Sequence, residues 1–132
     1  MCAMKNVIFV CQDNSYSQIA AAWMRDFEGD LIFVASAGLS IAKHIPNFAR
    51  VMNEVGIDIN DNNSKLLSDY HPYNFDAVIS LCTMSMRLPE QWMMCRIFDE
   101  WIVPQPEEES LEEYRYVRDD IRDKVKVLLR SK

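Results

Sequence analysis

The chain has 132 residues, of which 49% are hydrophobic and 26% charged; this is the composition of one globular domain and excludes a disordered chain. Its net charge is −6 and its basic residues are scattered, which argues against nucleic acid as a partner because a phosphate backbone requires clustered Lys and Arg. No apolar stretch approaches the ~20 residues that span a bilayer, and the start of the chain does not resemble a signal peptide. We therefore expect a single cytoplasmic domain over residues 1–132 with no membrane partner.

The four cysteines and two histidines are the candidate metal ligands and redox groups. Their wide spacing does not fit a zinc site, and we expect neither a bound metal nor a bound cofactor. Without a secretion signal, structural disulfides are not expected, and a buried thiol is the default interpretation of any one cysteine. Cys11 is the exception because of its position in the predicted secondary structure. The cysteines are Cys2, Cys11, Cys82 and Cys95.

The first predicted unit is a strand, a short polar loop and a helix. An apolar run predicts a buried strand over 5–10, and apolar residues at helical spacing predict a helix over 17–27, ended near Gly29. Cys11 stands directly after the strand, where loop amides and a helix dipole favour a bound anion and a thiolate. Cys11 is therefore the candidate nucleophile. The candidate anion loop is Gln12, Asp13, Asn14, Ser15, Tyr16 and Ser17.

The middle of the chain alternates strands and helices. Pro46 suits the first turn of a helix and Gly56 suits its C-terminal cap. A third apolar run again ends in a cysteine, Cys82. The predicted elements are strands over 31–36, 75–81 and 96–98, a helix over 46–55, a short helix around 64–68 and a helical turn over 89–94.

The last predicted element is an amphipathic helix of about five turns. Ser110 and Glu113 have the spacing of a capping box at its start. The order of elements predicts an α/β domain with a four-stranded parallel sheet and helices on both faces. Right-handed crossovers place the functional site at the carboxyl ends of the strands, so Cys11 and Cys82 are predicted to face one crevice. The apolar positions of the helix are Leu111, Tyr114, Val117, Ile121, Val125 and Leu128.

Several segments resemble the low-molecular-weight tyrosine phosphatase fold, a flavodoxin-like arrangement, and within it the arsenate reductases. The later segments are most similar to the glutathione/glutaredoxin-linked arsenate reductases of cyanobacterial type. The resemblance covers nearly the whole chain. It rests on Val10-Cys11, Asn14-Ser15, Ser17-Gln18, Ser36-Ala37-Gly38, and the segments 54–59, 76–82, 88–92, 97–101 and 110–118.

This resemblance implies a thiol mechanism on an oxyanion, arsenate or phosphate. In the family the thiolate attacks the arsenic of arsenate, and a second cysteine releases arsenite by forming a disulfide. Cys11 matches the nucleophile, Asn14 the residue that braces the loop, and Ser17 the serine that can hydrogen-bond the thiolate. Cys82 matches the second cysteine. Glutathione/glutaredoxin or thioredoxin is the implied reductant and partner.

The chain also departs from the family pattern. Its loop is one residue short and has no arginine, so either Tyr16 stands in the place of that arginine or the arginine is deleted. Gln105 stands at the position of the acid-loop aspartate, and Met84 and Pro89 stand where relatives have a third cysteine. A lost electrostatic clamp costs about 3–4 kcal/mol of transition-state stabilisation, or about 10²–10³ in rate. Cys95 is the remaining candidate for a third thiol.

The leading hypothesis is a divergent arsenate reductase with Cys11 as nucleophile and Cys82 as resolving cysteine, its activity weak or lost. Lys43 or Arg87 would then have to replace the missing clamp. One alternative is a catalytically inactive binding or regulatory module of the same fold, and another is a redox sensor that forms a Cys11–Cys82 disulfide. Tyrosine phosphatase activity ranks last because it requires both the arginine and the acid.

Overall fold

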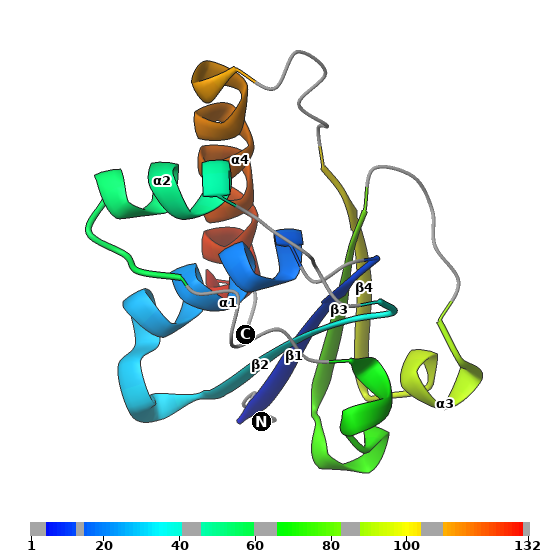
Figure 1. The fold of residues 1–132 in the computed structure, drawn as a ribbon. Coiled ribbons are helices and arrows are strands. Elements are labelled where there is room, and N and C mark those ends of the chain that lie inside the picture. Colours follow the sequence, from blue (N-terminus) through cyan, green and yellow to red (C-terminus); the bar gives the residue numbers. More distant parts are fainter. Residues whose placement is uncertain are drawn as a thin grey trace.

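The structure, a computed structural model, describes residues 5–12, 15–40, 46–59, 66–82, 88–103 and 110–130. Within these residues four strands form one parallel sheet in the order β2-β1-β3-β4 (Figure 1). This confirms the predicted α/β fold class. The strands are β1 (Asn6–Cys11), β2 (Phe33–Gly38), β3 (Ala77–Cys82) and β4 (Ile97–Ile102), and the helices are α1 (Ser15–Glu28), α2 (Pro46–Glu54), α3 (Glu90–Met93) and α4 (Leu111–Arg130).

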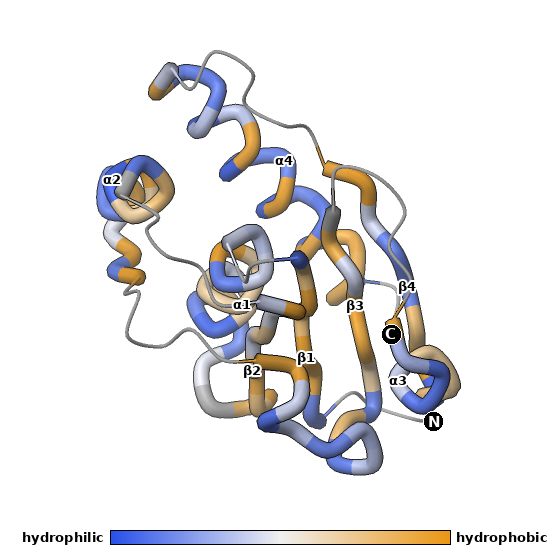
Figure 2. The backbone as a smooth tube through the Cα atoms, turned by 45° about the vertical axis from the view of Figure 1, so that its right-hand side comes forward, coloured by the Kyte–Doolittle hydropathy of each residue, from blue (hydrophilic) through white to orange (hydrophobic). Residues whose placement is uncertain are grey.

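The central strands are apolar because both of their faces are covered. The four residues 7–10 of β1 are each 0% exposed. Alternate side chains of a strand point to opposite faces, so Phe9 packs beneath the long helices whereas Ile8 packs on the other side of the sheet. In Figure 2 most of β1 and β3 is hydrophobic, as a parallel sheet with two covered faces requires.

Three helices, α1, α2 and α4, cover one face of the sheet (Figure 1). The Trp23 indole on α1 donates a hydrogen bond of 3.2 Å to the carbonyl oxygen of Arg118 on α4. Glu54, at the end of α2, pairs with Arg115 at 2.7 Å and with Arg118 at 3.0 Å. Hydrogen bonds from these guanidinium groups lower the pKa of Glu54 to about 2, and the bond from Arg115 contributes most. These contacts fix α2 and α1 against α4.

The other face of the sheet is covered by shorter elements, α3 and the 3₁₀ turns Leu67–Asp69 and Pro72–Asn74. Phe75 lies at the centre of this layer, with ring centroids 5.7 Å from Tyr70 and 5.9 Å from Trp92. The prediction of helices on both faces is therefore confirmed, with the difference that one layer is built from single turns around aromatic rings.

Glycine and capping signals locate the helix ends. Gly29 (φ 59°) and Gly56 (φ 81°) adopt the left-handed conformation after α1 and α2. At the start of α4 the Ser110 hydroxyl accepts from the Glu113 N–H at 3.3 Å, and the Glu113 carboxylate accepts from the Ser110 N–H at 3.4 Å. The predicted capping box is thus present.

Most element boundaries differ from the predictions by one or two residues, and the differences at the start of β2 and the end of β4 have a clear physical cause. β2 begins at Phe33 rather than at residue 31, because a 3₁₀ turn, Gly29–Leu31, follows α1 and leaves Leu31 81% exposed. β4 continues to Ile102 although its apolar run is interrupted at Asp99, because an edge strand keeps its pairing with β3 while turning polar side chains to solvent (Figure 2). Of the predicted short helix around 64–68, only residues 66–68 are described, and a 3₁₀ turn begins there at Leu67.

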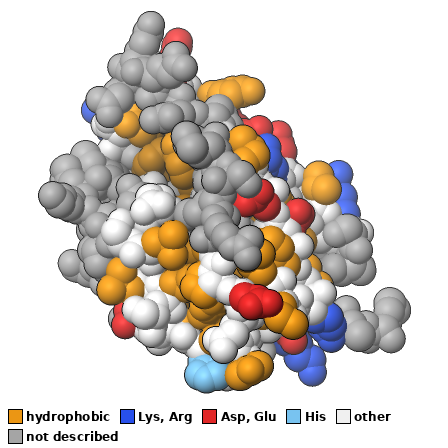
Figure 3. Space-filling view, turned by 90° about the vertical axis from the view of Figure 1, so that its right-hand side faces the viewer, with side chains coloured by type: hydrophobic (Ala, Val, Ile, Leu, Met, Phe, Trp, Pro, Cys, Tyr) orange, Lys and Arg blue, Asp and Glu red, His pale blue; other side chains and the backbone are white. Residues whose placement is uncertain are grey.

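No helix among the described residues is both long and apolar enough to cross a membrane. On the face shown in Figure 3, acidic, basic and apolar side chains of the described residues are interspersed rather than gathered by type.

Candidate functional site

Cys11 ends β1, and α1 begins four residues later at Ser15. The β1–β2 ladder extends past the strands and fixes this end of β1: the Leu39 N–H donates to the Cys11 carbonyl at 3.2 Å, and the Ser40 N–H donates to the Gln12 carbonyl at 2.9 Å. The Ser40 hydroxyl also donates to the Gln12 carbonyl at 3.1 Å. The backbone that carries the thiol is therefore held by β2 and the loop after it.

The Cys11 side chain is 1% exposed and lies against Ser17 of α1, with Sγ and Oγ 3.2 Å apart. The Ser17 hydroxyl is also 3.2 Å from the Ala37 carbonyl, to which it donates. A hydroxyl has one proton to donate. When Cys11 is a thiol, its S–H can donate to Ser17 while Ser17 donates to Ala37. When Cys11 is a thiolate, the same hydroxyl proton can turn to the sulfur and stabilise its charge.

The rest of the predicted anion loop divides into exposed and buried residues. The Gln12 side chain is exposed, whereas Ser15 is buried as the first residue of α1. The half-buried Tyr16 ring packs edge-on against Phe48 of α2, with centroids 5.6 Å apart, and Phe48 packs against Tyr114 of α4 at 4.6 Å. Tyr16 thus joins α1 to the two other long helices. Asp13 and Asn14 lie outside the described residues.

The backbone of Cys82 ends β3, the strand beside β1. Because Val10 pairs with Ser80 in the parallel ladder, Cys82 lies one residue beyond the level of Cys11, at the same carboxyl end of the sheet. Adjacent strands are about 4.8 Å apart. The topology therefore brings the two chain positions together. The side chain of Cys82 lies outside the described atoms, as do the residues Gln105, Lys43 and Arg87.

Cys95 lies two residues before β4, at the opposite end of the sheet from Cys11. It is half-buried, with Sγ 3.6 Å from the carbonyl oxygen of Pro72. Burial raises the pKa of the Cys95 thiol, and the negative charge of Asp76 raises it further. The length of the strands separates this thiol from Cys11.

Two buried side-chain atoms among the described residues have no hydrogen-bond partner, Gln18 Nε2 on α1 and Ser80 Oγ on β3. In the sequence, Gln18 stands out only as part of the family resemblance. The signal that could have singled it out is a long polar side chain directly beside Ile19 and Ala20 on a buried stretch of helix. Among the described residues, no three His, Cys, Asp or Glu side chains converge as metal ligands.

Comparison with known proteins agrees with the fold. Residues 6–132 match the family model of low molecular weight phosphotyrosine protein phosphatases. The chain is similar to a glutaredoxin arsenate reductase of Synechocystis sp., with 36% identity over 96% of this chain and 97% of that protein. It is 32% identical to an arsenate reductase of Bacillus cereus, over 92% of each chain.

Its fold is similar to that of a solved arsenate reductase in the phosphate binding state, with a TM-score of 0.88, 36% identity, and coverage of 97% of this chain and 98% of the other. The family match and the identity to these relatives each cover nearly the whole chain. The chain belongs to the low molecular weight phosphotyrosine protein phosphatase family.

Proposed function

We propose that this chain is an arsenate reductase of the thiol type, with Cys11 as the nucleophile and Cys82 as the resolving cysteine. The observation that carries the proposal is the buried Cys11 sulfur at the β1–α1 junction, 3.2 Å from the Ser17 hydroxyl. A thiol at a helix N-terminus next to a hydroxyl donor is in surroundings that favour the thiolate. The similarity to proteins named arsenate reductases supports arsenate as the oxyanion.

The proposed reaction has two chemical steps. The Cys11 thiolate attacks the arsenic of arsenate, an S–As bond forms, and one arsenate oxygen leaves as water after protonation. The Cys82 thiolate then attacks the Cys11 sulfur. The S–As electron pair passes to arsenic, which leaves as arsenite, and a Cys11–Cys82 disulfide remains. Two electrons from glutathione/glutaredoxin or thioredoxin restore the two thiols.

The absence of an arginine from the loop predicts a slow enzyme. A guanidinium group holds two oxygens of an oxyanion at once, and backbone amides alone do not replace its charge. We therefore expect a rate about 10²–10³ below that of an arginine-containing relative. Gln105 in place of an aspartate removes the acid needed for phosphomonoester hydrolysis, so phosphatase activity is not proposed.

The test is arsenite release from arsenate, measured with glutathione and glutaredoxin and, separately, with thioredoxin and its reductase. We expect slow release by the wild type, none above background by Cys11→Ser, and an unchanged rate for the matched control Cys95→Ser. A wild-type rate equal to that of Cys11→Ser with both reductants would reject the proposal.

A second candidate function is a binding or regulatory module of the same fold without catalytic activity. The missing arginine favours this candidate. It predicts no binding of arsenate or phosphate at millimolar concentrations, measured by calorimetry. A third candidate function is a redox sensor. It predicts a Cys11–Cys82 linked peptide in mass spectra after mild peroxide treatment, without any arsenite release.

A further inference from the structure

The two outer edges of the sheet belong to β2 and β4, because the strand order is β2-β1-β3-β4. An edge strand has backbone N–H and C=O groups that point away from the sheet, and these groups can pair with a strand of another molecule. Among the described residues, no further strand lies beside either edge, apart from a single bridge between Gly38 and Leu66. Each edge is therefore open to another chain unless side chains of the protein occupy it.

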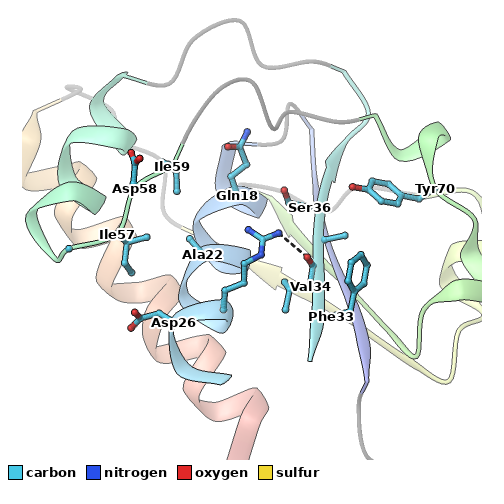
Figure 4. A pocket seen from close by; sticks show the side chains of 13 residues that line it. Gln18, Ala22, Asp26, Phe33, Val34, Ser36, Ile57, Asp58, Ile59 and Tyr70 are labelled. Carbon is cyan, nitrogen blue, oxygen red and sulfur yellow. Dashed lines mark hydrogen bonds between the residues drawn. The ribbon is translucent and has the colours of Figure 1, made fainter. Parts of the chain in front are cut away.

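At the outer edge of β2 the occupying group is a cation. The Phe33 N–H donates to the Lys5 carbonyl directly before β1. Because backbone groups of alternate residues point to opposite neighbours, those of Val34 point outward. The Arg25 guanidinium on α1 donates to the Val34 carbonyl at 2.8 Å (Figure 4), beside a pocket of about 600 Å³ that opens along this edge. A charged side chain thus binds an outward acceptor of β2.

The same alternation identifies the outward groups of β4. The Ile97 N–H donates to the carbonyl oxygen of Asp76, directly before β3, at 3.0 Å. The backbone groups of Ile97 therefore point toward β3. Those of Phe98, Glu100 and Ile102 point away from it, at the outer edge of the sheet.

At this edge the occupying group is the carboxylate of Asp99. Its Oδ1 atom accepts from the outward Glu100 N–H at 2.9 Å, and its Oδ2 atom accepts from the Trp101 indole N–H at 3.1 Å. Trp101 is 9% exposed and belongs to the core, so its packed ring orients the carboxylate. Asp99 and Trp101 both line a groove of about 290 Å³ between β4 and α4. The carboxylate therefore occupies the central outward N–H of the strand.

Without this contact, the edge of β4 would suit a second copy of the same chain. In an antiparallel pair with Glu100 at the two-fold axis, each outward residue of one strand faces an outward residue of the other. Phe98 then lies opposite Ile102 of the second copy at both ends of the pair, and Ile102 is 52% exposed. Apolar cross-strand pairs of this kind stabilise a sheet, whereas the like charges of the two Glu100 side chains at the axis oppose it.

From the occupied N–H and the self-complementary ends of the strand, we propose that Asp99 prevents two copies of this chain from pairing along β4. An incoming strand has to place a carbonyl oxygen where Asp99 Oδ1 lies. It therefore has to displace the carboxylate from both Glu100 and Trp101. The contact of Arg25 with β2 is the same device with the opposite charge. This role of Asp99 does not depend on the activity proposed for Cys11.

The test is the association state of Asp99→Ala, measured by sedimentation equilibrium with a phosphine reductant present so that no disulfide links two copies. We expect the wild type to be monomeric at about 0.5 mM and the variant to dimerise with a dissociation constant of about 0.1 mM. This is association about 100-fold stronger, because two Glu100 N–H groups gain carbonyl partners across the axis. Asp99→Val, which adds a stronger strand former, is the second variant if circular dichroism shows that Asp99→Ala misfolds.

Two further variants separate the hydrogen bond from other causes. Glu100→Gln removes a negative charge from the edge and keeps the Asp99 contact, so it should remain monomeric. Asp99→Ala combined with Glu100→Pro also removes the outward N–H, which an edge strand tolerates, and should return the protein to a monomer. The proposal is overturned if folded Asp99→Ala or Asp99→Val stays monomeric, or if the wild type, Glu100→Gln or the double variant dimerises at the same concentration.

Discussion

Cys11 and Cys95 lie at opposite ends of one parallel sheet, and their surroundings differ in kind. Cys11 is the last residue of β1, and its sulfur meets the Ser17 hydroxyl close to the start of α1. Cys95 precedes β4, and its sulfur lies near a carbonyl oxygen and the carboxylate of Asp76. The first set of groups is the one from which we propose a Cys11 thiolate, whereas burial and the charge of Asp76 raise the pKa of the Cys95 thiol. The two thiols thus have different neighbours because one lies at the carboxyl end of its strand and the other precedes the amino end of its strand.

The backbone N–H groups at the two ends of the sheet also have different hydrogen-bond acceptors. At the amino end the Asp76 carboxylate accepts from the N–H groups of Lys5 and Asn6 at 2.9 and 3.1 Å, so a charged side chain of the protein is already bound there. At the carboxyl end, the start of α1 is where we propose that an external anion binds. One end of the sheet is thus closed by its own carboxylate, and the other end is where a substrate anion is expected.

The largest effect should come from restoring the missing charge at the carboxyl end. Insertion of an arginine between Tyr16 and Ser17 recreates both the loop length and the guanidinium of the family pattern. We expect arsenite release to rise about 10²–10³-fold, because the guanidinium stabilises charge on the oxyanion oxygens in the transition state. Initial rates at saturating reductant measure this change.

Insertion of glutamine at the same place is the matched control, since it restores length without charge. A rate for the glutamine insertion equal to that of the arginine insertion would show that loop length, and not the cation, limits the reaction. No gain from either insertion would contradict an oxyanion site at the carboxyl end of the sheet and favour the inactive module.

The Ser17 hydroxyl should have the next largest effect. Hydrogen bonds to charged groups contribute about 1.5–3 kcal/mol, so Ser17→Ala should lower the rate of arsenite release about 10–100-fold and move the pH–rate profile to higher pH. Ser40→Ala removes a hydroxyl that only holds the Gln12 carbonyl, and its rate should fall less than threefold. Equal losses in the two variants would assign Ser17 a role in packing alone.

The fold could be predicted from the sequence because its signals are local. Apolar runs before Cys11 and Cys82 predicted the central strands, and Gly29 and Gly56 marked helix ends that the structure confirms. The extent of β4 could not be predicted in the same way, since pairing with β3 rather than hydrophobicity carries the strand through Asp99.

The site was only partly accessible to sequence reasoning. The position of Cys11 at a strand–helix junction follows from local pattern alone. The pocket at the outer edge of β2 does not, because its lining residues Gln18, Ser36 and Asp58 meet only through the packing of α1 beside the edge of β2 and the segment after α2. The family resemblance likewise contains no information about the side on which Gln18 points, which depends on the helix register of α1.

At the amino end, Asp76 should contribute measurable stability. Hydrogen bonds from the backbone N–H groups of Lys5 and Asn6 lower the pKa of Asp76, and the bond from Lys5 contributes most. Partial burial acts in the opposite direction, and the positive charge of Arg96 lowers the pKa further. A carboxyl whose pKa is lowered by folding stabilises the protein above its unfolded pKa, about 3.9. That contribution is lost as the pH falls through the lower folded value.

We expect Asp76→Asn to lower the free energy of unfolding by about 1–2 kcal/mol at pH 7, measured by urea unfolding. The difference between wild type and variant should shrink as the pH falls below about 4. Asp123→Asn, with 66% of its side chain exposed, should differ little from the wild type. A deficit of Asp76→Asn that stays constant to the lowest pH would exclude the carboxylate as its cause.

The smallest effect concerns the Cys95 thiol itself. Burial is the first cause of its raised pKa and the charge of Asp76 the second, so Asp76→Asn should lower that pKa only in part. Alkylation of Cys95 by iodoacetamide at pH 8, followed by peptide mass spectrometry, should become about two- to threefold faster, because the thiolate fraction rises. The alkylation of Cys11 in the same samples should not change, since Asp76 lies at the far end of the strands. If both cysteines reacted faster, the variant would have loosened the whole sheet, and the contrast between its two ends could not be assigned to local charge.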